Sequence, residues 1–382
     1  MRDKPYCKAP WIGLVYESNV GCKPCCEYIG GTTGVIPASF MGKYEDYKDS
    51  AWLKNFKAMM YLPTMNPGCK ICIDQEEANK KLNEYGDRLS RRQKFDRFDV
   101  DFHGENKIKR FDYRPGNKCN LSCRMCHPEA SSMREEEEIA RGNIQSIFRV
   151  EDMSDAYDID LTKCKELSIL GGEPSIDLEV RKWIDHVKDY DIDVCVTTNA
   201  TNTSNKWFQT LKKLKNEPEI WLSIDAAGEV NDFQRKGSVW SSVKDNIIKY
   251  RDEFYEGSSK LSIQLTASAI NFTTLDVWWD ELMELNIPIH SSPVIHPVEY
   301  NLGAIPDKFK EAQVIWLDNW LLEKPRHWRQ KREVKEAINI LRSNPYSKEK
   351  QQLFKSEVTS LDSWRNESII ELDYRFKEIL DA

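Results

Sequence analysis

The sequence predicts an α/β fold built on a mostly parallel sheet, and two patterns along the chain carry this prediction. From about residue 105, short apolar runs typical of strands alternate with stretches whose spacing is typical of helices. Strands that alternate with helices of this length form βαβ units, in which neighbouring strands run parallel. The strand candidates are Lys107–Tyr113, Glu166–Leu170, Asp193–Thr197, Ile220–Ile224, Leu261–Ala269 and a sixth near Ile287–Ile295.

Helices are predicted between these strands and again in the tail of the chain. The stretches Asp177–Tyr190, Lys206–Leu214 and Val239–Phe254 lie between successive strand candidates. From about Pro306, apolar residues recur near helical spacing, which predicts a helical extension. We expect this extension either to pack against the sheet or to cover a substrate as a lid.

Length and composition limit the class of protein. The chain has 382 residues, enough for two or three domains, and 31% of its residues are charged. It contains no run of eighteen apolar residues, and the segment Met1–Cys7 lacks the apolar core of a signal peptide. We therefore expect a soluble, cytoplasmic protein with no membrane partner. The net charge of −7 disfavours general binding to nucleic acid.

The eleven cysteines are the strongest chemical signal in the sequence. Because cytosolic thiols stay reduced, we expect metal ligands rather than disulfides. Three of them, Cys119, Cys123 and Cys126, share one short loop with the spacing C-x3-C-x2-C. A cubane [4Fe–4S] cluster has four irons, so three thiolates leave one iron open to a substrate or cofactor. The spacing fits zinc poorly, since structural zinc sites usually use C-x2-4-C pairs and four ligands.

This loop resembles the cluster loop of the radical S-adenosylmethionine (SAM) superfamily. The resemblance implies that the open iron binds the amino and carboxylate groups of SAM. It also implies that residues 105–300 form a partial (β/α)6 barrel of the TIM type, with a helical C-terminal extension over residues 301–382. Met125, directly before the last cysteine of the loop, stands where the superfamily often has an aromatic residue beside the adenine.

A Gly-Gly-Glu triplet follows the second strand candidate, about 45 residues after the loop, and resembles the superfamily's motif of the same residues. It consists of Gly171, Gly172 and Glu173. Glycines let the backbone approach a ligand closely. The Glu173 carboxylate and nearby backbone carbonyls are expected to accept hydrogen bonds from the amino group of SAM.

Two later strand ends resemble the remaining SAM-binding motifs of the superfamily. Thr198 and Asn199 stand where relatives have a Thr-Asn-Gly-like turn close to the ribose. Ser223 and Asp225 point to the same side of the following strand, because side chains alternate with a period of two. The resemblance implies that they contact the SAM carboxylate and the ribose, respectively. Arg235 follows, and its guanidinium suits a bidentate pair with a carboxylate.

A second group of cysteines lies within residues 1–95. The pairs Cys7-x17-Cys25 and Cys69-x2-Cys72 resemble the SPASM/twitch element, a small hairpin plus helix that carries an auxiliary iron–sulfur cluster. The element here precedes the barrel, as in some phage-encoded twitch radical SAM proteins. The resemblance implies an auxiliary [4Fe–4S] cluster whose four thiolates close the site. The implied ligands are Cys7, Cys25, Cys69 and Cys72, with Cys22 or Cys26 as alternates for Cys25.

Together, these resemblances imply an oxidoreductase that cleaves SAM reductively to a 5′-deoxyadenosyl radical, which removes a hydrogen atom from a substrate C–H bond. A donor such as flavodoxin or ferredoxin would supply the electron, and the auxiliary cluster would collect one afterwards. The substrate is expected to be a peptide, since SPASM/twitch enzymes often modify peptides. Two alternatives stay open: a radical SAM enzyme acting on a sugar or nucleotide, and a non-catalytic zinc-ribbon interaction protein.

Overall fold

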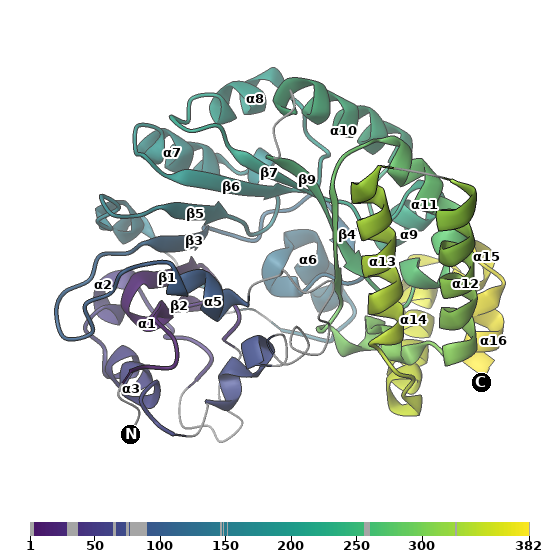
Figure 1. Cartoon of the computed structure of the whole chain (residues 1–382), viewed down its shortest axis with the longest axis horizontal. Coiled ribbons are helices and arrows are strands. Elements are labelled where there is room, and N and C mark those ends of the chain that lie inside the picture. The colour runs from purple at the N-terminus through teal and green to yellow at the C-terminus, as the bar shows by residue number, and fades with distance from the viewer. Residues whose placement is uncertain are drawn as a thin grey trace. The chain divides into compact units, whose positions relative to one another are not determined.

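The computed structural model of the chain describes residues 4–28, 37–63, 66–73, 76, 90–145, 147, 149–150, 152–255, 260–324 and 327–381. Figure 1 shows its helices and strands, coloured along the chain. The chain divides into two compact units, each made of several segments. Unit 1 comprises Met1–Lys118, Ser146–Val196 and Phe208–Glu219, and unit 2 comprises Cys119–Gln145, Thr197–Trp207 and Ile220–Ala382.

The sheet of unit 1 is mostly parallel. Its strands are β1 (Gly13–Glu17), β2 (Gly21–Lys23), β3 (Arg110–Arg114), β5 (Glu166–Ile169) and β6 (Asp193–Thr198, of which the residues up to Val196 belong to the unit). They are hydrogen-bonded in the order β6-β5-β3-β1-β2, and only the β1–β2 hairpin is antiparallel. All five residues of β1 are buried, as expected for a strand covered on both faces. The cysteine-rich N-terminal segment therefore shares a sheet with three of the predicted barrel strands.

Several helices of unit 1 begin after a residue whose side chain caps the first turn. α7 (Leu178–Val187) begins after Asp177, whose carboxylate accepts the backbone N–H of Glu179. It buries one face, including Trp183 and Ile184. The others are α1 (Ala9–Ile12), α2 (Tyr44–Tyr47), α3 (Ala51–Met59), α5 (Arg91–Asp96), η1 (Pro67–Cys69), η3 (Ser154–Asp158) and η4 (Pro174–Ile176), while α8 (Asn205–Leu211) spans a boundary between segments.

Unit 2 contains three parallel strands and a separate two-stranded ribbon. The parallel strands are β7 (Glu219–Ser223, from Ile220 onward within the unit), β9 (Leu261–Ala267) and β10 (Ile289–Pro293), in the order β10-β9-β7. The ribbon pairs β4 (Ser122–Cys123) antiparallel with β8 (Arg235–Lys236).

The helices of unit 2 connect these strands and then form the C-terminal part of the chain. α10 (Trp240–Phe254) lies between β7 and β9 in sequence, and α11 (Leu275–Glu284) lies between β9 and β10. The later helices stand next to one another in Figure 1, where α13 packs on both β10 and α12. The remaining elements are α6 (Ser132–Ala140), α9 (Gly228–Gln234), α12 (Asp307–Glu323), α13 (Trp328–Arg342), α14 (Lys348–Arg365), α15 (Ile369–Leu372), α16 (Arg375–Asp381), η2 (Pro128–Ala130), η5 (Asn271–Thr273), η6 (Val298–Tyr300) and η7 (Leu302–Ala304).

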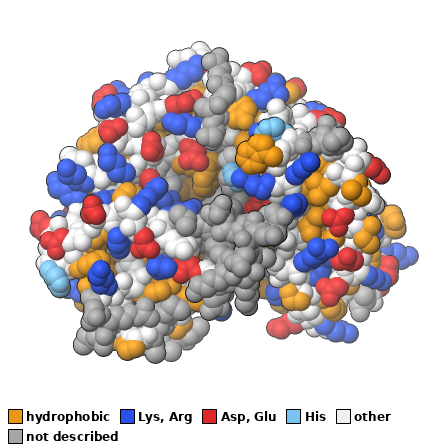
Figure 2. All heavy atoms as spheres, in the orientation of Figure 1, with side chains coloured by type: hydrophobic (Ala, Val, Ile, Leu, Met, Phe, Trp, Pro, Cys, Tyr) orange, Lys and Arg blue, Asp and Glu red, His pale blue; other side chains and the backbone are white. Residues whose placement is uncertain are grey.

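The predicted α/β class, the mostly parallel strands and the helical tail are confirmed. Each of the six strand candidates overlaps an observed strand. The sequence does not predict that β1 pairs in parallel with β3, because the pairing joins segments about 95 residues apart. Over the ranges described, no helix is long and apolar enough to cross a membrane. Figure 2 shows basic and acidic side chains interspersed over the viewed face.

Candidate functional site

The three-cysteine loop of unit 2 leads into α6 and is tied to the first turn of that helix. Cys119, Cys123 and Cys126 are all partly buried, and Cys123 belongs to β4. The Ser132 hydroxyl accepts the backbone N–H of Cys119 at 3.1 Å and lies 3.2 Å from its carbonyl oxygen. Ser131 donates to the carbonyl of Leu121 at 2.7 Å. These contacts fix the backbone that carries the three thiols.

Arg235 brings a buried positive charge to this loop. Its Nη1 lies 3.9 Å from Sγ of Cys123, and its Nε donates to Oδ2 of Asp225 at 3.1 Å. The β4–β8 ribbon fixes this approach, since Cys123 and Arg235 are partners in register. Burial raises the pKa of the Cys123 thiol to about 11, although the charge of Arg235 lowers it. A cation here would offset the negative charge of a thiolate-bound metal group.

Asp225 orients Arg235 through a carboxylate that already has two protein partners. Its Oδ2 accepts from Arg235, and its Oδ1 accepts the backbone N–H of Thr266 at 2.9 Å. The side-chain amide of Asn271 donates to the Asp225 carbonyl at 2.6 Å. The predicted contact of Asp225 with the SAM ribose stays a prediction. Ser223 is partly buried at the end of β7, on the same side by the period of two.

Asn199 ties the turn after β6 to the cysteine loop. Its Nδ2 donates to Oδ1 of Asn120 at 3.0 Å, and Asn120 is the residue directly after Cys119. Thr201 completes the set, because its hydroxyl donates to Asn199 at 2.7 Å and accepts from Asn120 at 2.9 Å. The side chain of Asn199 therefore fixes the loop, and its predicted place close to SAM stays a prediction.

The residues around Asn199 fit a turn that relatives build with glycine. Ala200 stands at the glycine position and is fully buried with φ of 60°, the left-handed region that costs non-glycine residues energy. Thr198 is buried, and its hydroxyl accepts the backbone N–H of Ala200 at 3.3 Å. Met125, predicted to flank the adenine, is partly buried in the cysteine loop.

The Gly-Gly-Glu turn of unit 1 packs against the segment that precedes Cys119 in sequence. A Cβ on Gly172 would lie 2.2 Å from the carbonyl oxygen of Lys118, and φ there is +46°. The backbone N–H of Glu173 donates to the same carbonyl at 2.7 Å. The Glu173 carboxylate is buried and accepts the backbone N–H of Ser175 at 3.0 Å. A side chain at position 172 would therefore clash with the Lys118 carbonyl, which explains the glycine, and the predicted approach of this turn to a ligand stays a prediction.

A pocket in unit 1 is lined by four cysteines from three separate segments of the sequence. They are Cys7 before α1, Cys25 after β2, Cys69 in η1 and Cys72 one turn later. The pocket has an empty volume of about 390 Å³, with the open space at its mouth included. Cys22 and Cys26, the alternates for Cys25, are not among its lining residues.

The surroundings of this pocket are apolar and aromatic. Cys7, Cys25 and Cys69 pack against a buried cluster that includes Tyr28 and Phe56. Backbone N–H groups donate to two of the sulfurs, from Ala9 to Cys7 at 3.4 Å and from Glu27 to Cys25 at 3.3 Å. Such N–H···S bonds are among the interactions that tune iron–sulfur centres.

Two thiols of the pocket, Cys7 and Cys69, have raised pKa values, which favours their protonated form in the absence of metal. Burial, with the neighbouring cysteines, raises the pKa values of Cys7 and Cys69 to about 12 each. Loading of metal would therefore release protons. Among the described residues, no group of three or more His, Cys, Asp or Glu side chains meets the geometry for a single bound metal ion.

Sequence reasoning missed one set of residues around the loop. Arg124, between Cys123 and Cys126, is completely buried and pairs with Asp362 and Glu367 from the C-terminal helical part. A charged residue inside a metal-binding loop is a weak signal that it is buried there. The sequence holds no signal for its partners, which lie about 240 residues later.

Residues 113–265 match the family model of the Radical SAM superfamily. The range includes the three-cysteine loop, the Gly-Gly-Glu turn and the strand ends after β6 and β7. The superfamily uses a [4Fe–4S] cluster and SAM. No curated protein is significantly similar to the chain.

Several solved structures are also similar to the chain. Native anSMEcpe with bound AdoMet is 16% identical over 56% of this chain and 61% of that one, with a TM-score of 0.41. Streptococcus suis SuiB bound to precursor peptide SuiA is 13% identical over 75% and 60%, with a TM-score of 0.42. SuiB bound to S-adenosylmethionine is 14% identical over 74% and 60%, with a TM-score of 0.38. The chain thus spans about 60% of the length of these structures.

Proposed function

We propose that this chain is a two-cluster radical SAM enzyme that oxidatively modifies a substrate C–H bond. The observation that carries the proposal is the match to the Radical SAM superfamily, together with the partly buried three-cysteine loop beside the Arg235 guanidinium. Three thiolates would hold a [4Fe–4S] cluster with one open iron, where SAM binds. Bound there, cluster and SAM supply a radical able to remove a hydrogen atom from an unactivated carbon.

The residues of the loop fit such a group. Three thiols in eight residues come from a backbone that Ser131, Ser132 and Asn199 hold in place. Arg235 donates toward one of the sulfurs and is itself fixed by Asp225. These residues position the cluster, and the buried guanidinium favours its anionic form.

The SAM-binding residues proposed here come from several strand ends. Glycines 171 and 172 are proposed to allow the close approach of the backbone to SAM, and the lack of a side chain at Gly172 already permits a close contact with the Lys118 carbonyl. Arg235 is proposed to meet the SAM carboxylate with the guanidinium nitrogens that Asp225 does not occupy. The full proposed set is Met125, Gly171, Gly172, Glu173, Thr198, Asn199, Ser223, Asp225 and Arg235.

The N-terminal pocket is proposed to hold an auxiliary [4Fe–4S] cluster. Its four lining cysteines are the four implied by the SPASM/twitch resemblance, and the β1–β2 hairpin and α3 are consistent with that element. Four thiolates close the site to substrate, which favours electron transfer. The cluster would accept the electron left on the substrate, which makes the net reaction an oxidation.

The substrate class that we propose is a peptide, and this part of the proposal follows from the SPASM/twitch resemblance alone. The electron donor is proposed to be a flavodoxin or ferredoxin, and the location the cytoplasm. A sugar or nucleotide substrate is the alternative for the same chemistry.

The proposal is tested by anaerobic reconstitution of the full chain with iron and sulfide, followed by dithionite and SAM. We expect about 8 irons per chain and formation of 5′-deoxyadenosine. Cys123→Ala should lower the iron content to about 4 and abolish the product, because the loop cluster is lost. Absence of 5′-deoxyadenosine from the wild type, or undiminished formation by Cys123→Ala, would refute the proposal.

The same preparations separate the alternatives. Substantial zinc in the N-terminal pocket, with about 4 irons per chain, would replace the auxiliary cluster by a structural zinc site. Zinc without iron would favour the interaction protein. Incubation with pooled peptides or with nucleotides and sugars, read as substrate-dependent 5′-deoxyadenosine, distinguishes the two substrate classes.

A further inference from the structure

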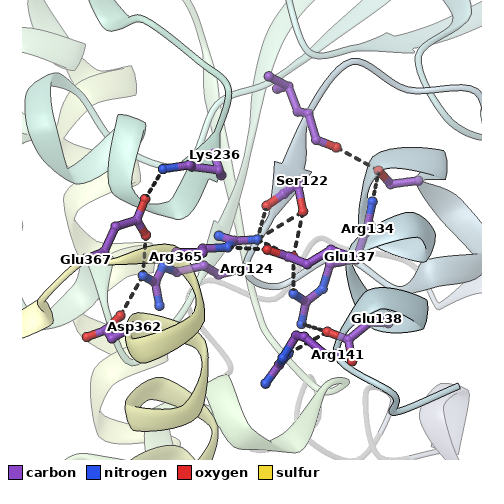
Figure 3. Close-up of polar contacts among 12 residues, drawn as sticks. Ser122, Arg124, Arg134, Glu137, Glu138, Arg141, Lys236, Asp362, Arg365 and Glu367 are labelled. Carbon is purple, nitrogen blue, oxygen red and sulfur yellow. Dashed lines mark hydrogen bonds and ion pairs between the residues drawn. The ribbon is translucent and has the colours of Figure 1, made fainter.

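Buried ion pairs within unit 2 connect the C-terminal helices to the three-cysteine loop. Figure 3 shows that they come from the loop, from α6, from β8 and from the end of α14. We call this set the loop brace. Its members are Ser122, Arg124, Arg134, Glu137, Glu138, Arg141, Lys236, Glu357, Asp362, Arg365 and Glu367.

Arg124 is the member inside the cysteine loop. Its Nη2 lies 2.6 Å from a carboxylate oxygen of Asp362 and 2.6 Å from one of Glu367. Its Nε donates to the carbonyl of Phe233 at 3.1 Å, and its guanidinium lies 3.8 Å from the centre of the Phe233 ring. The backbone N–H of Arg124 also donates to the carbonyl of Gln234 at 2.7 Å. Both the side chain and the backbone of this residue are thus fixed.

Arg365 makes the second connection, to the residue directly before Cys123. It donates from Nη2 to the Ser122 carbonyl at 2.6 Å and to Oε2 of Glu137 at 2.7 Å. Its Nε donates to the other carboxylate oxygen of Glu137 at 2.7 Å. Ser122 in turn donates to Glu137 at 2.8 Å. The C-terminal part therefore holds the loop on both sides of Cys123.

The charges of the loop brace balance. Five cations face five anions, so the sum is zero; they are Arg124, Arg134, Arg141, Lys236 and Arg365 against Glu137, Glu138, Glu357, Asp362 and Glu367. Removing Arg124, whose side chain is fully buried, takes a cationic partner from the largely buried Asp362 and Glu367 carboxylates, which is strongly unfavourable. Glu367 also pairs with Lys236, the neighbour of Arg235 in β8, so one carboxylate connects β8 to Arg124, the residue directly after β4.

We propose that Arg124 is a positioning residue for the metal group of the three-cysteine loop and that Asp362 and Glu367 are the groups that position it. The inference rests on the proposed function, since it presumes a cluster at the loop. Arg124 touches no reacting atom in this account. It sets the backbone path from Cys123 to Cys126, so the C-terminal extension is part of the cluster site rather than a separate covering layer.

The test uses the full chain carrying Cys69→Ser and Cys72→Ser, so that loop iron alone is observed. Arg124→Gln, Asp362→Asn and Glu367→Gln are compared with Glu371→Gln, a matched loss of one carboxylate at an exposed position on α15. Three quantities are measured: the thermal midpoint of the metal-free chain, the rate of iron loss to a chelator, and the electron paramagnetic resonance spectrum of the reduced cluster with and without SAM.

We expect Arg124→Gln to lose iron at least about tenfold faster than the parent, and each carboxylate variant a few-fold faster. The retained cluster should also give a spectrum whose SAM-induced change is reduced or absent. Glu371→Gln should match the parent. If Arg124→Gln fails to fold, Asp362→Asn and Glu367→Gln test the inference instead. Each of these variants leaves Arg124 with one of its two carboxylate partners, so the chain is expected to fold.

Two results would overturn the inference while leaving the proposed function intact. One is iron loss and spectra in all three variants that match Glu371→Gln. The other is a lowered thermal midpoint with unchanged spectra, which would make Arg124 structural only. A parent chain that loads no iron at the loop, measured as iron content unaffected by Cys123→Ala, would instead remove the proposed function and the inference together.

Discussion

The two groups of cysteines differ in what surrounds their sulfur atoms. In the N-terminal pocket, the backbone N–H groups of Ala9 and Glu27 donate to sulfur, and the lining is largely aromatic and apolar. In the three-cysteine loop, the guanidinium of Arg235 donates toward a sulfur, and buried ion pairs hold the backbone. Packing maintains the first site, and charge maintains the second.

This difference predicts which changes each site tolerates. An apolar pocket is disturbed when volume is removed, because the cavity left behind is only partly refilled. A site held by buried ion pairs is disturbed when one charge is removed, because its partner is left unpaired in a medium of low dielectric. Each site should therefore be insensitive to the change that disables the other.

The largest effect is expected from the loss of a pocket cysteine, which should remove iron from one site and leave the other site intact. Cys69→Ser should lower the iron content from about 8 to about 4 per chain while SAM cleavage to 5′-deoxyadenosine continues. The reason is that this thiol belongs to the pocket and the loop keeps its three cysteines. Iron analysis and product chromatography on the same sample provide the measurement. Loss of SAM cleavage in step with pocket iron would show that the sites are not independent.

The second largest effect is expected from a smaller side chain in the apolar cluster beside the pocket. Phe56 is buried, stacks on Trp52 with ring centres 5.2 Å apart and meets the edge of Tyr28 at 4.6 Å. Phe56→Ala should lower the free energy of unfolding by about 3 kcal/mol, through lost burial and the cavity left behind. Denaturant titration of the metal-free chain measures it. Pocket iron should fall more than loop iron, and an equal fall at both would contradict the comparison.

Removing the charge of Glu137 should destabilise the loop, with a smaller loss in the free energy of unfolding that depends on pH. Burial opposes the charge of Glu137, but Arg365, Ser122 and Arg134 outweigh it and bring the pKa of this carboxyl down from 4.5 to about 2. A carboxyl with a lowered pKa in the folded state stabilises above its unfolded pKa and loses that contribution as pH falls. Glu137 should therefore contribute about 2 kcal/mol above pH 4.5, allowing for its partial exposure, and nothing below about pH 2.

The measurement is the thermal midpoint of wild type and Glu137→Gln between pH 7 and the lowest pH at which unfolding is reversible. The difference should be constant above about pH 5 and shrink as the solution becomes more acidic. Glu371→Gln serves as the exposed control. A difference that stays constant down to pH 3 would mean that the ion pairs do not stabilise the loop.

Much of the fold was predictable because its signals are local. The six strand candidates and the helical tail follow from short-range periodicity, and the structure has a strand or helix at each place. The pairing of β1 with β3 was not predictable in this way, because five buried residues carry no alternation and their partner strand lies far along the chain.

In the candidate site, too, features with a local sequence signal were predictable and features that depend on distant residues were not. The cysteine loop and the Gly-Gly-Glu triplet could be recognised from the sequence because each motif consists of residues close together along the chain. The protein contacts of Asn199 and Asp225 depend on partners elsewhere in the sequence, namely Asn120 and Arg235, so local patterns could not predict them. No pattern in the sequence around Arg124 indicates its partners, Asp362 and Glu367.

Because Arg124 and Asp362 are far apart in the sequence, the ribosome makes the cysteine loop well before the carboxylates that pair with Arg124. The two residues are 238 positions apart, so at about 5–20 residues per second the cysteines leave the ribosome roughly 10–50 s before the carboxylates that balance Arg124. During that interval the loop lacks its anchor. Stable insertion of the proposed metal group should therefore follow synthesis of residues 362–367, and a chain truncated before residue 362 should retain less iron even though all eleven cysteines are present.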